Sequence, residues 1–198
     1  MPSLVVPRHA AAEEGRVEDA ARKPYHVSVH RTVQQQTGDQ MNDTALRNQL
    51  VELLKGDHAH TSFDAAVRDF PFPMAGRRIE GLPYTAWQIL EHLRIAQWDI
   101  LDFSRNPGYI YIKWPDDYWP KDEAPANASA WEKCLAAFRS DLKAMQELVA
   151  NPATDLFAKI PWGEGQTILR EAIVLGNHNS YHIGQLVLLR RLLGTWRG

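Results

Sequence analysis

Two histidines stand four residues apart in a strongly apolar, helix-forming segment, GNHNSYHIGQLVLLRRLLG (residues 176–194). On a helix, residues i and i+4 have Cβ atoms about 5–6 Å apart. His178 and His182 could therefore bind one metal ion through ring nitrogens, each at about 2.0–2.1 Å. The alternative is a pair of core histidines whose nitrogens are satisfied by neighbouring hydroxyls or carbonyls.

The surroundings of the pair carry more weight than its spacing, because His26 and His30 have the same spacing without an apolar face. Polar groups on an apolar face cost free energy unless something binds them. At 100° per residue, the stripe that carries the pair also contains Glu171, Val174, Leu175, Gln185, Leu186, Leu189 and Leu192.

A metal ion needs a third ligand, and His92 is the best candidate. It is the one other histidine within a long amphipathic pattern, TAWQILEHLRIAQWDILDFS, where Ile89, Ala96 and Ile100 are among its helical neighbours. Three neutral imidazoles leave a coordination position open for water or substrate, which is typical of catalytic zinc sites. The sequence therefore predicts His92, His178 and His182 as metal ligands.

Motifs that are specific to well-known enzyme classes are absent. Asn179 occupies the position at which an HExxH metalloprotease has its glutamate, so no protease base is supplied there. No Glu-x-x-His occurs, which excludes the ferritin-type di-iron bundle. The chain also has no P-loop, GxGxxG or GxSxG sequence.

Composition narrows the class of protein. The 198 residues are 44% hydrophobic with a net charge of −2, which suits one sizeable core and argues against nucleic acid or an anionic membrane as the partner. The single cysteine, Cys134, excludes an intramolecular disulfide. No apolar run is long enough to span a membrane, and the N-terminal residues do not resemble a signal peptide. We expect a cytoplasmic protein that acts on a small molecule. The sequence does not decide whether it forms a homodimer.

Apolar periodicity and capping residues predict an all-α fold, a four-helix bundle over residues 41–198. Residues 1–40 have no sustained period and are expected to be a flexible tail. A short helix is expected from Thr61, where Asp64 completes a capping box. Four principal helices are expected. The first starts at Asp43 or Thr44 and ends near Gly56, and the other three span Tyr84–Ser104, Ser129–Val149 and Thr167–Gly194.

The residues of the site carry a family resemblance. A helix containing EHL (residues 91–93), followed by NHNSYHIGQL (residues 177–186), resembles the DinB/YfiT-like family of metalloenzymes, close to its DinB-like subgroup. The similarity extends from about Met41 to Trp196 and includes LPYTAWQILEHLRIAQWDILDFS and the WPDDYWP loop. Residues 1–40 match nothing in the family.

The resemblance implies a four-helix bundle with up-down-down-up connectivity. It also implies a divalent metal, Ni²⁺ or Zn²⁺, held by the histidines that correspond to His92, His178 and His182. Characterised members of the family include metal-dependent transferases and isomerases that use low-molecular-weight thiols such as bacillithiol or mycothiol. A thiol-dependent S-transferase, or a related transferase, isomerase or hydrolase, is therefore expected.

Other side chains are secondary candidates, each with a plainer interpretation. Glu171 could act as a general base or orient a metal-bound water, or it could pair with an arginine or complement the helix dipole. Gln185 could hydrogen-bond across helices. His58 or His60 could approach the metal or lie exposed in a turn. The WPDDYWP loop (residues 114–120) could be a lid, a pocket wall or a hydrophobic plug, and Cys134 is expected in the core.

Three classes of protein fit this sequence. The first is an enzyme with an open three-histidine metal site. The second is a metal-stabilised structural or interaction protein, which a closed fourth ligand such as His60 would favour. The third is a plain bundle without metal, which requires other partners for His178 and His182.

Overall fold

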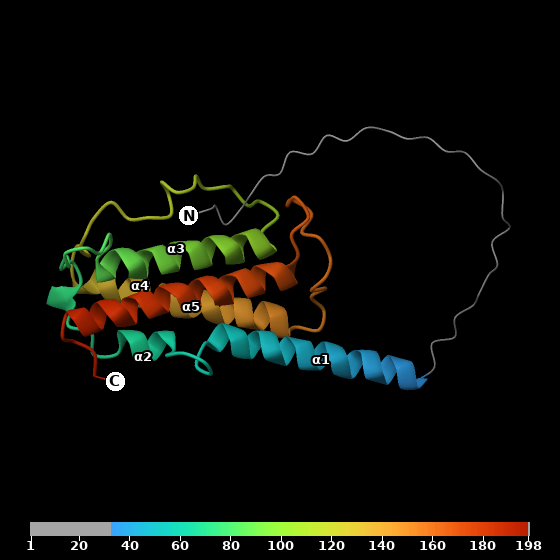
Figure 1. Ribbon diagram of the computed structural model, residues 1–198. Helices are drawn as coiled ribbons and strands as arrows, with labels where there is room; N and C mark the ends of the chain where they lie inside the picture. The colour runs from blue at the N-terminus through green and yellow to red at the C-terminus, as the bar shows by residue number, and fades with distance from the viewer. Residues whose placement is uncertain (1–32, 198) are drawn as a thin grey trace, which may run out of the picture. The chain divides into compact units, whose positions relative to one another are not determined.

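A computed structural model describes residues 33–197, with side chains from residue 40 onward (Figure 1). Residues 1–32 of the expected tail lie outside this range. The chain divides between Asn42 and Asp43 into two units, and the second unit carries the predicted metal ligands.

Within the described range all regular structure is helical, which confirms the all-α prediction. One isolated bridge, Lys159 with Thr167, is the sole β pairing among these residues. None of the described helices is long and apolar enough to cross a membrane. In chain order the helices are α1 (Val33–Lys55), α2 (Phe63–Val67), the 3-10 helix η1 (Phe72–Met74), α3 (Ala86–Arg105), α4 (Ala128–Ala150) and α5 (Ile168–Leu192).

The helix starts follow side-chain caps, some of which differ from those predicted. Thr85 and Gln88 form a reciprocal capping box at the start of α3, and Thr167 caps α5 as expected. Helix α4 begins slightly before the predicted Ser129, because Oδ1 of Asn127 caps it by accepting a hydrogen bond from the backbone amide of Ala130. Ser62, rather than Thr61, caps α2.

The first helix begins at Val33, well before the predicted caps Asp43 and Thr44. The carboxylate of Asp43 does not cap it. It accepts a hydrogen bond from Nε of Arg47 at 2.7 Å, one helical turn further along. A pairing at i and i+4 supports a continuous helix through this point, so the acidic residue was misread as a helix start.

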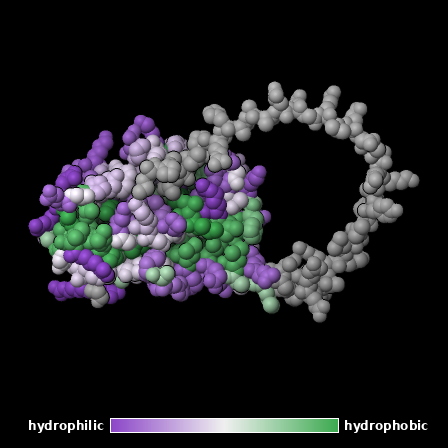
Figure 2. All heavy atoms as spheres, viewed as in Figure 1, coloured by the Kyte–Doolittle hydropathy of each residue, from purple (hydrophilic) through white to green (hydrophobic). Residues whose placement is uncertain are grey.

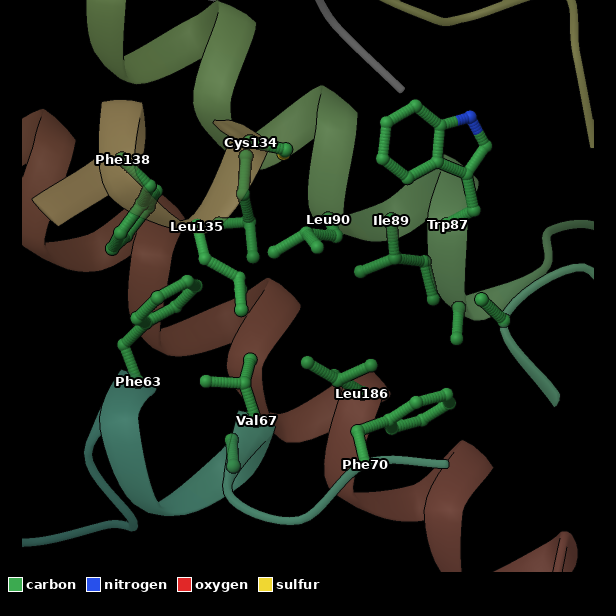
Figure 3. Packing of buried hydrophobic residues seen from close by; sticks show 14 of the residues in the cluster. Phe63, Val67, Phe70, Trp87, Ile89, Leu90, Cys134, Leu135, Phe138 and Leu186 are labelled. Carbon is green, nitrogen blue, oxygen red and sulfur yellow. The ribbon is translucent and has the colours of Figure 1, made fainter. Parts of the chain in front are cut away.

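Two hydrophobic clusters form the core of the second unit. One cluster joins α2 to the first halves of α3 and α4 and the last third of α5, with Phe63, Leu90, Phe138 and Leu186 among its members (Figure 3). The other joins the end of α1 to the second halves of α3 and α4 and the start of α5. On α5 the buried polar residues 178, 179 and 182 lie between the two clusters.

Helix α5 contacts the rest of the unit on one side and solvent on the other. In Figure 1 it runs in the direction opposite to α3 and α4. Its outward residues Ile173, Leu188 and Leu192 are exposed large apolar side chains. The face seen in Figure 2 accordingly shows green apolar patches among the purple polar surface.

Arg47 ties α1 to the end of α4. Its guanidinium is buried and donates to the backbone carbonyls of Val149, Asn151 and Thr154, each at 2.9 Å. The last carbonyls of a helix have no partner within the helix, so one side chain satisfies the acceptors at the end of α4 and the turn that follows.

The loss of these donors should cost much of the stability of the unit. We expect Arg47→Met to lower the free energy of unfolding by about 2–4 kcal/mol, because buried carbonyls would lose charged donors. Urea unfolding monitored by circular dichroism measures this. Arg139→Met is the control, since its ion pair with Asp64 is exposed and is expected to contribute less than about 1 kcal/mol. Equal effects of the two substitutions would contradict the role of Arg47.

Candidate metal centre

Three buried histidines from two helices face one another. Helix α3 supplies His92, which is 1% exposed, and α5 supplies His178 and His182, which are 8% and 7% exposed. Nε2 of His92 lies 3.1 Å from Nε2 of His178 and 3.1 Å from Nε2 of His182. The predicted ligands therefore form one cluster, whose donor atoms lie within 4.8 Å of one another.

These separations suit a shared metal ion. Two nitrogens bound to one ion at about 2.0–2.1 Å are about 2.9 Å apart in octahedral geometry and about 3.4 Å apart in tetrahedral geometry. The observed 3.1 Å falls between these values. The spacing and the donor set both fit a first-row divalent ion, for which imidazole is a suitable ligand.

The hydrogen bonds of the outer ring nitrogens show which way the lone pairs point. Nδ1 of His92 lies 2.9 Å from the backbone oxygen of Tyr118, which can only accept. Nδ1 of His182 lies 2.7 Å from Oε1 of Gln185. In a neutral imidazole one nitrogen donates and the other accepts, so both rings turn an Nε2 lone pair toward the centre.

Two lone pairs 3.1 Å apart repel each other unless a cation lies between them. His178 is also incompletely satisfied, because its buried Nδ1 makes no hydrogen bond of good geometry. A plain bundle would require both histidines of α5 to be satisfied by other partners. The observed contacts do not satisfy them fully, which disfavours that interpretation.

Burial keeps the three histidines neutral. Desolvation lowers the pKa of His92 to about 4 and that of His178 to about 3, where the neighbouring imidazoles add to the effect. It also lowers the pKa of His182, against the hydrogen bond to Gln185. Metal ligation requires neutral imidazole, so each ring is held in the protonation state that a ligand needs.

Aromatic side chains of the loop between α3 and α4 cover the cluster. The Trp119 ring stacks on His92, with centroids 3.8 Å apart and planes inclined by 3°. Tyr84 stacks on the same tryptophan at 3.8 Å, and His182 meets it at 5.9 Å. The WPDDYWP loop is therefore a wall of the candidate centre.

Glu171, the predicted catalytic residue, lies in the first turn of α5 and is 4% exposed. Its carboxylate accepts a hydrogen bond from Nη1 of Arg170. Burial raises the pKa of Glu171 above its ordinary value, against the opposing charge of Arg170. It is not part of the three-histidine cluster, so its catalytic role stays a prediction beside an observed arginine pairing.

Of the other secondary candidates, Gln185 bonds to His182 of the cluster, whereas His58 and His60 bond elsewhere. Gln185 bonds within α5 rather than across helices. Nε2 of His60 lies 2.8 Å from Oγ of Ser180, and His58 pairs with Glu52 at 2.8 Å. Neither histidine belongs to the cluster, so His60 does not close it as a fourth ligand.

Two polar features of this region were missed from the sequence. The backbone oxygen of Tyr118 holds His92, and no residue pattern signals a contact between a helix and a distant loop. From the sequence, Asn179 shows only that the glutamate of a metalloprotease motif is absent. Its Nδ2 donates to Oε1 of Gln97 at 2.9 Å, beside the histidines. Both amide side chains lie on the core-facing sides of their helices, a pattern in the sequence that could have predicted this contact.

No family model, no curated protein and no solved structure matches the chain.

The metal-free protein should lose stability as the pH falls below about 6.5. Because the pKa values of His92 and His178 are lowered in the folded state, the unfolded chain binds more protons between about pH 6.5 and 4. We therefore expect the free energy of unfolding to decrease by several kcal/mol from pH 7.5 to 4.5. Urea unfolding in the presence of chelator measures this.

The matched variant is His178→Asn, which removes one of the titrating rings and should flatten that dependence. A wild-type stability that is constant over this range would contradict the burial of neutral histidines.

Proposed function

We propose that this protein is a metal-dependent enzyme of the DinB/YfiT-like kind, with one divalent ion held by His92, His178 and His182. The observation that carries the proposal is that two Nε2 atoms of α5 approach the Nε2 atom of His92 while the outer nitrogens of two of the rings are already hydrogen-bonded. Ni²⁺ and Zn²⁺ are the ions that the sequence resemblance implies.

The proposal includes the topology of the family, a four-helix bundle with up-down-down-up connectivity. Two features support it. The end of α1, together with α3, α4 and α5, contributes to one hydrophobic cluster. In Figure 1, α3 and α4 run one way, while α5 and the second half of α1 run the other way.

The chemistry that suits this centre is the activation of a small nucleophile. A divalent ion acts as a Lewis acid and keeps a bound thiol or water anionic near neutral pH. Three protein ligands leave a coordination position for that group, and Trp119 shields the centre from bulk water. We therefore propose a small-molecule transferase or isomerase, with a low-molecular-weight thiol as cosubstrate. Hydrolysis is the same chemistry with water as the nucleophile.

A second candidate function is a metal-stabilised protein without catalysis. The observation that favours it is the closed surroundings of the cluster, whose histidines are at most 8% exposed beneath Trp119. In this case the ion would serve the fold alone, as in structural zinc sites.

Metal content is the direct test of the proposed centre. We expect about one divalent ion per chain in untagged protein, and much less in His178→Ala, His182→Ala and His92→Ala, because each substitution removes a ligand. Elemental analysis measures this. His60→Ala is the matched control, since it removes a histidine outside the cluster and should leave the content unchanged. Full metal content in a His178/His182 double variant would refute the centre.

Chelation separates the enzyme from the metal-stabilised protein. Because two large apolar clusters supply most of the burial, removal of the ion should lower the melting temperature without unfolding the protein at room temperature. Calorimetry and circular dichroism with and without chelator measure this. Complete unfolding after chelation would support the structural function instead.

A further inference from the structure

The orientation of His92 depends on the loop that covers it. Its Nδ1–H donates to the backbone oxygen of Tyr118, a residue 26 positions further along the chain. Groups that bond the outer nitrogen of a metal-binding histidine fix its tautomer and orientation. The position of this one carbonyl therefore decides where the lone pair of His92 points.

The side chain of Tyr118 fastens that carbonyl to helix α3. Its phenol donates to Oδ2 of Asp99 at 2.5 Å, and the ring is almost fully buried. Asp99 lies on the same helix as His92, seven residues later, which is about two turns. One loop residue thus contacts α3 twice, through its carbonyl at His92 and through its hydroxyl at Asp99.

Asp99 holds a second phenol of the same loop region. The hydroxyl of Tyr109 donates to Oδ1 of Asp99 at 2.8 Å. Burial raises the pKa of both tyrosines, and the nearby carboxylate raises it further, so both phenols stay protonated donors. The two bonds occupy both oxygens of the carboxylate, but Tyr118 alone also contacts a proposed metal ligand.

We propose that Asp99, acting through Tyr118, is a positioning residue that sets the tautomer and direction of His92. As a statement about metal binding, this inference rests on the proposed function. Neither residue reaches the centre with its side chain as a ligand. Their effect is on the affinity of the site, because a misdirected imidazole binds an ion less well.

Tyr118→Phe and Tyr109→Phe form a matched pair of tests. Each removes one phenol from Asp99 and keeps the ring, and Tyr118→Phe retains the backbone carbonyl. We expect Tyr118→Phe to weaken Zn²⁺ binding about tenfold in competition with a chromophoric chelator. Tyr109→Phe should stay within about twofold of the wild type. Urea unfolding of both metal-free variants controls for a general loss of stability.

A second readout does not depend on metal. Nitrogen-15 NMR of the imidazoles in the metal-free protein should show His92 as the Nδ1–H tautomer in the wild type and in Tyr109→Phe. In Tyr118→Phe the Nε2–H tautomer should appear alongside it.

The outcomes separate the two proposals. Zn²⁺ binding that is strong in the wild type and equal in both variants would overturn the positioning inference and leave the proposed function standing. A wild type that binds neither Zn²⁺ nor Ni²⁺ would overturn the proposed function. The tautomer of His92 would then decide the positioning inference, and an unchanged tautomer in Tyr118→Phe would overturn it.

Discussion

The removal of three imidazoles from water is the constraint on which the rest of this structure depends. Each ring is at most 8% exposed, and an isolated buried charge is too costly to keep, so the histidines are held neutral. Neutral rings still carry one donor and one acceptor each. Most of the polar arrangement around the cluster follows from the need to satisfy those six nitrogens.

Hydrogen bonds account for the outer nitrogens better than for the inner ones. The carbonyl of Tyr118 and the amide of Gln185 accept from two of the rings, while three Nε2 atoms point at a common centre. The apolar clusters on either side provide no polar group to fill that centre. A divalent cation would satisfy all the inward lone pairs at once, which is why the geometry favours a metal centre over a core of polar contacts.

The loop between α3 and α4 belongs to the site as much as the helices do. It supplies an acceptor for His92, a ring that stacks on His92, and two phenols that bond to Asp99 of α3. Long loops without secondary structure are uncommon and are usually functional or disordered. This loop covers the histidine cluster and orients one of its rings. Reactivity at the centre would therefore depend on how the loop is held, as well as on the ligands themselves.

Local sequence patterns predicted the helices and singled out the three histidines that the structure brings together. Apolar residues at helical spacing predicted four long helices and placed His178 and His182 on one inward stripe, because the period of a helix decides which residues share a face. Capping residues were less informative. Asp43 accepts a hydrogen bond from Arg47 inside α1 instead of capping it, and Asn127 rather than Ser129 caps α4. A polar residue at a helix start and one within the first turns look alike in sequence, since both can bond locally.

Tertiary structure alone decided which groups surround the three histidines. His92 could be chosen from its own helix, but its distance from His182 depends on how α3 packs against α5. The contacts of Tyr118 with His92 and Asp99 join residues of different elements. The structure also shows that Glu171 accepts a hydrogen bond from Arg170, and its catalytic role stays a prediction. Periodicity specifies the face of a helix on which a side chain lies, whereas only packing specifies what that face meets.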